Sequence, residues 1–114
     1  MTDSPPTVFT DLLAEAAIPA RGIHSQTLST GDGVELVLFA FAAGEALAEH
    51  TSARPAIIHV LSGEGELTVA GDAYPAAAGT WVRMPSSCRH SLSARTPMVM
   101  ALYLLPPGGS GSAD

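Results

Sequence analysis

Two of the four histidines in this chain lie in stretches that also hold regularly spaced glycine and proline. The first stretch runs from Gly44 through five residues to His50. The second runs from Gly79 through five residues to Pro85 and ends at His90. Imidazole nitrogens bind metal ions, exchange hydrogen bonds with ligands and titrate near neutral pH. Metal binding, small-molecule binding and acid–base catalysis are therefore the chemistries to consider.

These spacings resemble the two motifs of the cupin superfamily. The first motif is glycine, five residues, His-x-His, three or four residues, glutamate, six residues and glycine; the second is glycine, five residues, Pro-x-Gly, two residues and histidine. Residues 57–65 also resemble the strand and turn that follow the glutamate. The resemblance covers about residues 34–105. It implies an all-β fold, the double-stranded β-helix or jelly-roll barrel.

The resemblance also implies a metal site of three histidines and one glutamate on neighbouring strands. Carried over by position, His50 matches the first histidine and His90 the last. Ser52 stands at the second histidine position, Ala56 at the glutamate and Ser87 at the glycine after the proline. Alanine offers no donor and a neutral hydroxyl is a weak one, so two imidazoles fall short of the three protein ligands usual in catalytic sites.

Three functions stay open, and the sequence does not decide whether the protein is an enzyme. The first is a small-molecule-binding cupin of unknown ligand, whose cavity is lined by His50 and His90 together with Ser52, Arg54, Ile58, Cys88 and Tyr103. The second is a metal-dependent enzyme of dioxygenase or isomerase type, in which both histidines hold one divalent Fe, Mn, Ni or Zn ion; the first function needs no cofactor. The third, metal-free acid–base catalysis by the pair, ranks last because no motif carboxylate orients either ring.

Three side chains near the motifs have a specific expectation. Arg54 is expected at the barrel rim, where a guanidinium binds carboxylates in a fork. If Cys88 lies in a strand, it faces the same side as His90 and could supply a thiolate ligand; otherwise it is a small buried residue. His59 lies three residues after Ala56, so strand alternation places it on the opposite face, outside the cavity.

Short apolar runs cut by glycine and proline must position these side chains. They predict strands over residues 34–43, 56–61, 66–70, 73–76, 80–84, 91–94 and 99–105. Strands at this spacing, without alternating helices, are typical of an antiparallel sandwich or barrel. We expect an N-terminal arm over residues 1–22, with a short helix at 12–17 capped by Asp11, then a barrel over 23–106 and a disordered tail over 107–114.

Composition narrows the class of protein further. A length of 114 residues, 46% hydrophobic and 14% charged, fits one folded domain. All five basic residues are arginines, and the absence of lysine excludes Schiff-base chemistry and a P-loop. A net charge of −6 argues against a nucleic-acid partner. The single cysteine, Cys88, excludes an internal disulfide.

Location and assembly are also expectations at this stage. The first residues lack a signal-peptide pattern, and the longest apolar run, residues 98–105, is far shorter than the roughly 20 residues that span a bilayer. We therefore expect a cytoplasmic protein with no membrane partner. The resemblance to small cupins, which usually pair by exchanging or adding edge strands, implies a homodimer, and we expect a strand near residues 23–28 to be the exchanged or added element.

Overall fold

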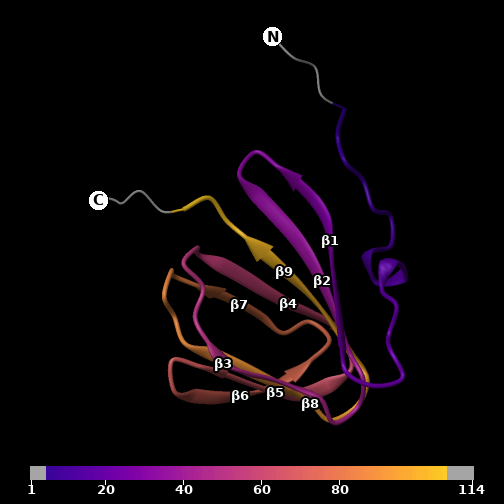
Figure 1. Cartoon of the computed structure of the whole chain (residues 1–114), viewed down its shortest axis with the longest axis vertical. Coiled ribbons are helices and arrows are strands. Elements are labelled where there is room, and N and C mark those ends of the chain that lie inside the picture. The colour runs from indigo at the N-terminus through magenta and orange to yellow at the C-terminus, as the bar shows by residue number, and fades with distance from the viewer. Residues whose placement is uncertain (1–4, 108–114) are drawn as a thin grey trace.

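The computed structural model describes residues 5–107, which form two antiparallel β-sheets facing one another (Figure 1). One sheet has five strands in the order β1-β2-β9-β4-β7, and the other has four in the order β3-β8-β5-β6. The strands are β1 (Ile23–Gly31), β2 (Val34–Phe41), β3 (Ala46–His50), β4 (Ala56–Ser62), β5 (Glu64–Val69), β6 (Asp72–Ala77), β7 (Trp81–Met84), β8 (His90–Ala94) and β9 (Met98–Leu104). This is the predicted all-β jelly roll.

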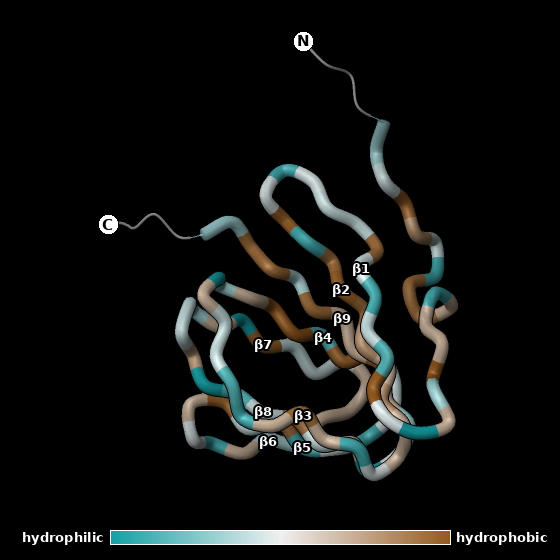
Figure 2. Tube along the Cα trace, viewed as in Figure 1, coloured by the Kyte–Doolittle hydropathy of each residue, from teal (hydrophilic) through white to brown (hydrophobic). Residues whose placement is uncertain are grey.

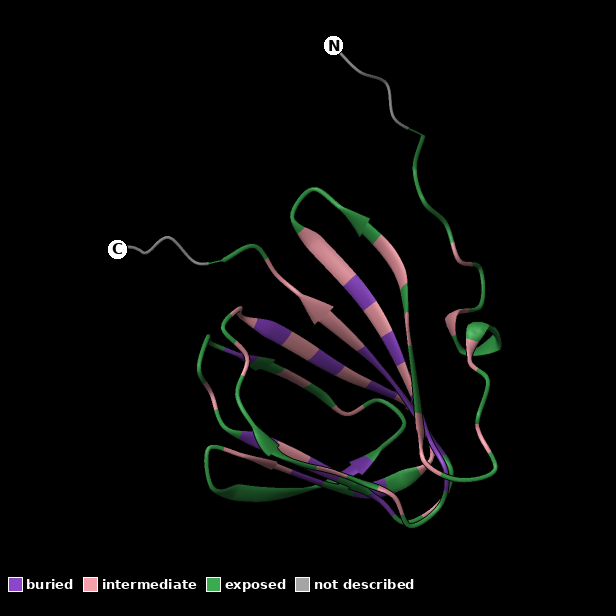
Figure 3. Cartoon of the chain, viewed as in Figure 1, coloured by how far each residue is buried: buried purple, intermediate pink, exposed green. Residues whose placement is uncertain are grey.

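The main core fills the space between the two sheets. Strand β4 shows how the sequence produces it, because Ala56, Ile58 and Val60 are buried while the residues between them are half-buried on the other face. Strands β2, β4 and β9 carry much of the apolar sequence (Figure 2) and many of the buried positions (Figure 3). The largest core side chains are Phe41, Ile58, Val60, Leu67, Met84, Met98 and Met100.

A second apolar cluster lies on the outer face of the five-stranded sheet. It is built on Leu36, Leu38, Ala40, Val99 and Ala101, all buried. The N-terminal arm contributes to it through Phe9, Leu12 and Ala16. Both faces of β2 and β9 are therefore apolar, which explains why these strands read as nearly continuous hydrophobic runs.

The helix of the arm is shorter than the sequence pattern predicts. It is one 3-10 turn, η1 (Leu12–Glu15), and not a helix over residues 12–17. The Asp11 carboxylate accepts a hydrogen bond from the Ala14 backbone N–H at 3.3 Å, so the predicted cap is present. Ala16 already has extended backbone angles, and it packs against the outer cluster. So short a segment has too few hydrogen bonds to sustain an α-helix against that contact.

At Gly63 the chain crosses from one sheet to the other. Strand β4 belongs to the five-stranded sheet and β5 to the four-stranded sheet, so the two do not pair. Gly63 has a φ of +90°, and a side chain there would collide with the backbone of Pro97 and Met98. Only glycine fits this crossing without strain.

Strand β1 pairs with β2 of the same chain, and its other edge is the edge of the sheet. Residues 108–114, most of the tail that the sequence predicts to be disordered, lie outside the described residues. Between residues 5 and 107, no helix has the length and apolar character needed to cross a membrane.

Candidate functional site

The two motif histidines meet at one end of the four-stranded sheet. His50 ends β3, His90 begins β8, and the strand register places them directly opposite each other. Their ring centroids lie 4.2 Å apart, with the planes at 57°. His50 is exposed and His90 is only 6% exposed. The register shifts between Leu47 and His50, and such an irregularity re-aims the side chain that follows it.

Each ring is held by a backbone carbonyl two residues before it. Nδ1 of His50 lies 2.8 Å from the Ala48 carbonyl oxygen, and Nδ1 of His90 lies 3.0 Å from that of Cys88. A carbonyl oxygen only accepts, so Nδ1 carries the proton and donates in both rings. In the neutral pair, both Nε2 atoms are therefore left with a free lone pair.

The Nε2 atom of His90 keeps access to solvent although the residue is buried. This atom has no hydrogen-bond partner among residues 5–107. Every fully buried side-chain nitrogen or oxygen in that range does have a partner, so the Nε2 atom of His90 is not fully buried. Burial lowers the pKa of His90, and the nearby charge of His50 lowers that pKa further; the hydrogen bond to the Cys88 carbonyl opposes this only in part. The ring is therefore neutral at physiological pH and presents an acceptor.

The residues at the motif positions do not fit a resident catalytic metal. Within the described part of the chain, no three His, Cys, Asp or Glu side chains form a group that could hold an ion. Ala56, at the position of the motif glutamate, is 2% exposed and part of the apolar core. The Ser52 hydroxyl accepts a hydrogen bond from the Arg54 backbone N–H at 3.1 Å. Two imidazoles alone leave the usual set of three ligands incomplete.

Cys88 contacts the histidine pair through its backbone, because its carbonyl oxygen accepts the hydrogen bond from Nδ1 of His90. It lies in the turn before β8, which begins at His90, so strand alternation does not apply to it. Its Sγ is directed at the Arg89 carbonyl oxygen, at 3.7 Å, and its side chain packs against the core. Of the two expectations for Cys88, the structure therefore favours a small packing residue over a thiolate ligand, and its side chain is half-buried.

Arg54 is engaged with its own chain. Its Nη1 pairs with Glu35 at 2.9 Å, and its Nε donates to the Leu105 carbonyl at 2.8 Å. Its Nη2 donates to the carbonyls of Gly33, at 2.6 Å, and Leu104, at 3.2 Å. The guanidinium therefore joins the β1–β2 turn to the end of β9, and most of the donors expected to hold a ligand already have partners within the chain.

The other predicted lining residues lie apart from the pair. Ile58 is buried between the sheets. Tyr103 faces the opposite side of the five-stranded sheet, where it packs beside Leu36 in the outer cluster, so the structure does not bring it into one cavity with Ile58. His59 also lies on that outer face, as alternation predicts, with Trp81 as its partner on β7.

Ser52 takes part in the connection that holds the second motif in place. Its carbonyl accepts a hydrogen bond from the Ser87 backbone N–H at 2.7 Å. Ser87 has a φ of +66°, in the left-handed region that favours glycine. The family motif has glycine at this position, and the φ value gives the physical reason. This link joins the loop after His50 to the turn before His90.

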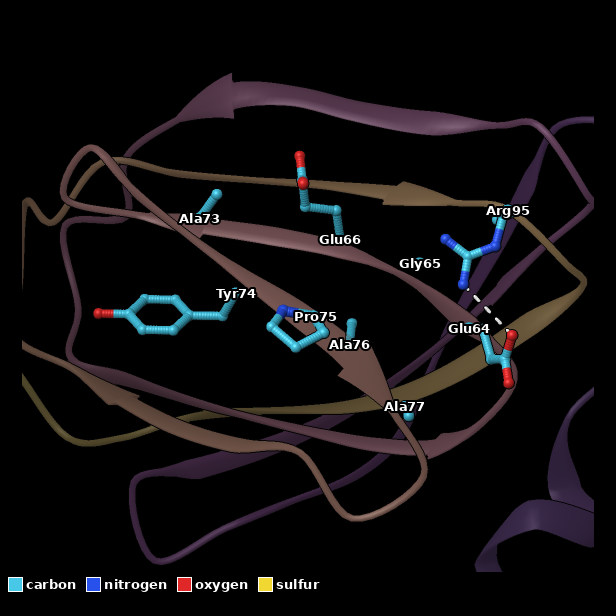
Figure 4. A pocket seen from close by; sticks show the side chains of 9 residues that line it. All are labelled: Glu64, Gly65, Glu66, Ala73, Tyr74, Pro75, Ala76, Ala77 and Arg95. Carbon is cyan, nitrogen blue, oxygen red and sulfur yellow. Dashed lines mark hydrogen bonds and ion pairs between the residues drawn. The ribbon is translucent and has the colours of Figure 1, made fainter.

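Four shallow hollows on the described surface, of about 290 to 560 Å³, are lined by residues other than His50, Ser52, Cys88 and His90. One of them lies along β5 and β6 (Figure 4). Another is a groove between β6 and β7 that includes Tyr74, Trp81 and Arg83. One signal for this groove is visible in the sequence, because Trp81 and Arg83 are two residues apart in a predicted strand and so share a face.

Comparison with known proteins agrees with this fold. Residues 37–105, more than half of the chain, match the family model described as a cupin domain. The chain belongs to the cupin family. None of the curated proteins matches its sequence significantly.

Several solved structures are similar to this cupin over most of its length. An RmlC-like cupin from Desulfovibrio desulfuricans is 25% identical with a TM-score of 0.78, over 90% of this chain and 100% of that one. A conserved protein of unknown function from Streptococcus pyogenes is 26% identical with a TM-score of 0.77, over 95% of each chain. A cupin superfamily protein from Desulfitobacterium hafniense is 20% identical with a TM-score of 0.78, over 90% of this chain and 94% of that one.

Proposed function

We propose that this cupin binds a small organic molecule through hydroxyl groups that donate hydrogen bonds to His50 and His90. The observation that carries the proposal is the pair of Nδ1–carbonyl hydrogen bonds, at 2.8 and 3.0 Å. These bonds turn both Nε2 lone pairs into acceptors in the neutral rings. A carboxylate or carbonyl ligand offers no donor to such a pair, whereas a sugar or polyol offers several.

The surroundings of His90 suit a binding site with one apolar wall. Val69, on the adjacent strand β5, lies directly beside His90 in the register. Leu92 follows His90 by two residues and lies on the same face of β8. Both side chains belong to or pack against the core between the sheets. Few polar groups on an apolar wall are the usual make-up of a small-molecule site. The polar groups fix the orientation of the ligand, and the wall buries its carbon skeleton.

The second candidate is a metal-dependent enzyme of dioxygenase or isomerase type with a reduced ligand set. The observation that favours it is the orientation of both rings through Nδ1, which metal-binding histidines also show. The missing third ligand weighs against it. Elemental analysis of untagged protein, purified without chelator, separates the two. Near-stoichiometric Fe, Mn, Ni or Zn that disappears in His50→Ala favours the enzyme.

We also propose that the protein is a homodimer formed through the free edge of β1. This nine-residue strand carries neither proline nor a carboxylate between Ile23 and Gly31. The opposite edge strands are less suited, because β7 has four residues and β6 contains Pro75. Light scattering at the column outlet should give a dimer mass, and lysines at the exposed Ser25 and Thr27 should give a monomer mass. A monomer from the unaltered chain would contradict the proposal.

Binding is tested with a panel of monosaccharides and linear polyols. Thermal shift identifies the compounds that stabilise the protein, and calorimetry near pH 8 measures the affinity of the best one. We expect His50→Ala and His90→Ala each to weaken the affinity for that compound about tenfold or more. Each substitution removes one hydrogen bond to the ligand and the ring that lies beside the other histidine. His59→Ala is the matched control, because His59 lies on the outer face of the five-stranded sheet, away from the pair. Unchanged affinity in both variants of the pair would overturn the proposal.

A further inference from the structure

A groove beside β6 is not lined by either histidine of the pair. In the four-stranded sheet, β5 separates β6 from β8, the strand that carries His90. The groove lies between β6 and β7, the edge strands of the two different sheets, and has a volume of about 560 Å³. Val69 and Val82 contribute apolar surface to it. Ligand pockets have volumes of roughly 300–1,000 Å³. The groove is therefore large enough for a small organic molecule.

Two exposed aromatic side chains, one from each sheet, line this groove. Tyr74 on β6 is 49% exposed and Trp81 on β7 is 56% exposed. Every other large hydrophobic side chain exposed among residues 5–107 is aliphatic and lies in the N-terminal arm. Half-exposed rings keep apolar surface in water, which a stacked ligand would remove. Tyrosine and tryptophan are also the residue types most enriched where proteins bind.

The groove has a cation with no carboxylate partner in the described part of the chain. Arg54, Arg89 and Arg95 each pair with a glutamate. Arg83 forms no ion pair or side-chain hydrogen bond with any described residue, and no acidic residue lines the groove. A positive site on a chain of net charge −6 selects an anion. A guanidinium holds a carboxylate with two parallel hydrogen bonds.

The neighbouring hollow, which shares Tyr74, does not offer the same combination. Figure 4 shows its cation, Arg95, joined to Glu64 at the end of the hollow far from the Tyr74 ring. Glu66 adds a second negative charge there. An anion is therefore disfavoured on that side of β6 and favoured on the side that faces β7.

We propose that the groove between β6 and β7 binds a small aromatic carboxylate. Its ring packs against Tyr74 and Trp81, and its carboxylate accepts hydrogen bonds from Arg83. None of the three residues occupies a ligand position of a cupin motif, and neither His50 nor His90 lines the groove. The ligand class follows from the two rings and the single cation.

The experiment uses Trp81 as its own reporter, because it is the only tryptophan in the chain. Phenylacetate, which does not absorb where tryptophan is excited, is titrated into the full-length protein while tryptophan emission is followed. We expect a saturable change in emission. Phenylacetamide has the same shape without the charge and should bind about tenfold more weakly or worse.

Variants locate the binding site. Arg83→Gln should weaken phenylacetate binding to the level of the amide, and Tyr74→Ala should weaken both compounds. Arg95→Gln is the matched control, an exposed arginine outside the groove, and should leave both affinities unchanged. His50→Ala should also leave them unchanged, which separates this site from the histidine pair. Thermal unfolding of each variant checks that the fold is intact.

Three results would overturn the proposal. The first is the absence of a saturable change in emission together with no ligand signal in saturation-transfer NMR. The second is equal affinity for phenylacetate and phenylacetamide, or an unchanged affinity in Arg83→Gln. The third is a change in Trp81 emission with protein concentration alone, which would mean that a second copy of the chain occupies the groove.

Discussion

His50 and His90 lie opposite each other on β3 and β8, and each ring donates its Nδ1 proton to the carbonyl oxygen two residues earlier in the chain. The same local bond thus orients both rings, without a carboxylate. A protein that has lost two motif ligands would be expected to lose the orientation of the remaining two. Here the backbone maintains it, so the pair can still recognise a ligand.

Removing one histidine should change the titration of the other. In His50→Ala, the pKa of His90 should rise toward the ordinary histidine value of about 6.5. Burial lowers that pKa in the native protein and the charge of His50 lowers it further, and the substitution reduces both effects. NMR titration of the His90 ring protons measures the change. A pKa that stays the same or falls in the variant would show that neither effect comes from His50.

Stability should depend on pH through His90. Its pKa is lower in the folded state than in the unfolded chain, so between the two values the unfolded chain binds more protons. Its contribution is therefore fully present above the ordinary histidine pKa and is lost as pH falls toward the lower, folded value. Urea unfolding at about pH 7.5 and about pH 5.5 should show a larger loss of stability in the native protein than in His90→Asn. Equal losses would be inconsistent with a lowered pKa.

The sequence predicts the fold well because the fold depends on patterns that are locally complete. Apolar runs bounded by glycine and proline located seven of the nine strands, and the strand expected over residues 23–28 from the family's mode of pairing corresponds to β1. Strand β3 was missed. Its residues, Ala-Leu-Ala-Glu-His over 46–50, have high helix propensity, and pairing with β8 makes them a strand. The strand that carries His50 is therefore set by tertiary contacts that a single segment does not show.

The site was harder to predict than the fold, for reasons visible at two residues. Motif spacing correctly identified His50 and His90 as the residues that meet. It gave no information on the face occupied by Tyr103, because both faces of β9 are apolar and alternation is hidden there. The expectation that Arg54 binds a ligand at the rim did not include its hydrogen bonds to the carbonyls of Gly33 and Leu105. These carbonyls lie next to β2 and β9 and come together only in the folded chain.

Arg54 should matter for stability. Arg54→Lys replaces a forked guanidinium that contacts Glu35 and three carbonyls with a single ammonium group, and should destabilise the fold by about 1–2 kcal/mol. The control is Arg95→Lys, an exposed ion pair, which should cost less than about 0.5 kcal/mol. Urea unfolding measures both. If the two substitutions cost the same, the hydrogen bonds of Arg54 to the three carbonyls add no stability beyond that of an ordinary surface ion pair.

Substitutions at two glycines with nearly the same φ can distinguish the cost of backbone strain from the cost of a steric collision. Gly63 and Gly71 have φ values of +90° and +89°, but only at Gly63 would a side chain meet the backbone of another segment. Gly71→Ala should cost about 1 kcal/mol for the left-handed backbone. Gly63→Ala should cost about 3 kcal/mol or more, because the collision with Pro97 and Met98 is added. Comparable losses would mean that β4 and β9 have room to separate at the crossing.

The last prediction tests whether the motif positions of this cupin still have the geometry of a metal site. The double substitution Ser52→His and Ala56→Glu restores the family's ligand set beside His50 and His90. Without metal it should lower the melting temperature, because position 56 is 2% exposed in the core and an unpaired carboxylate is costly there. One equivalent of Mn²⁺, Ni²⁺ or Zn²⁺ should recover that loss in the double variant and leave the native protein unchanged, since binding to the folded state alone raises stability. Elemental analysis after dialysis should give about one metal ion per chain. A double variant that folds but retains no metal would show that positions 50, 52, 56 and 90 no longer have the geometry of the family's metal site.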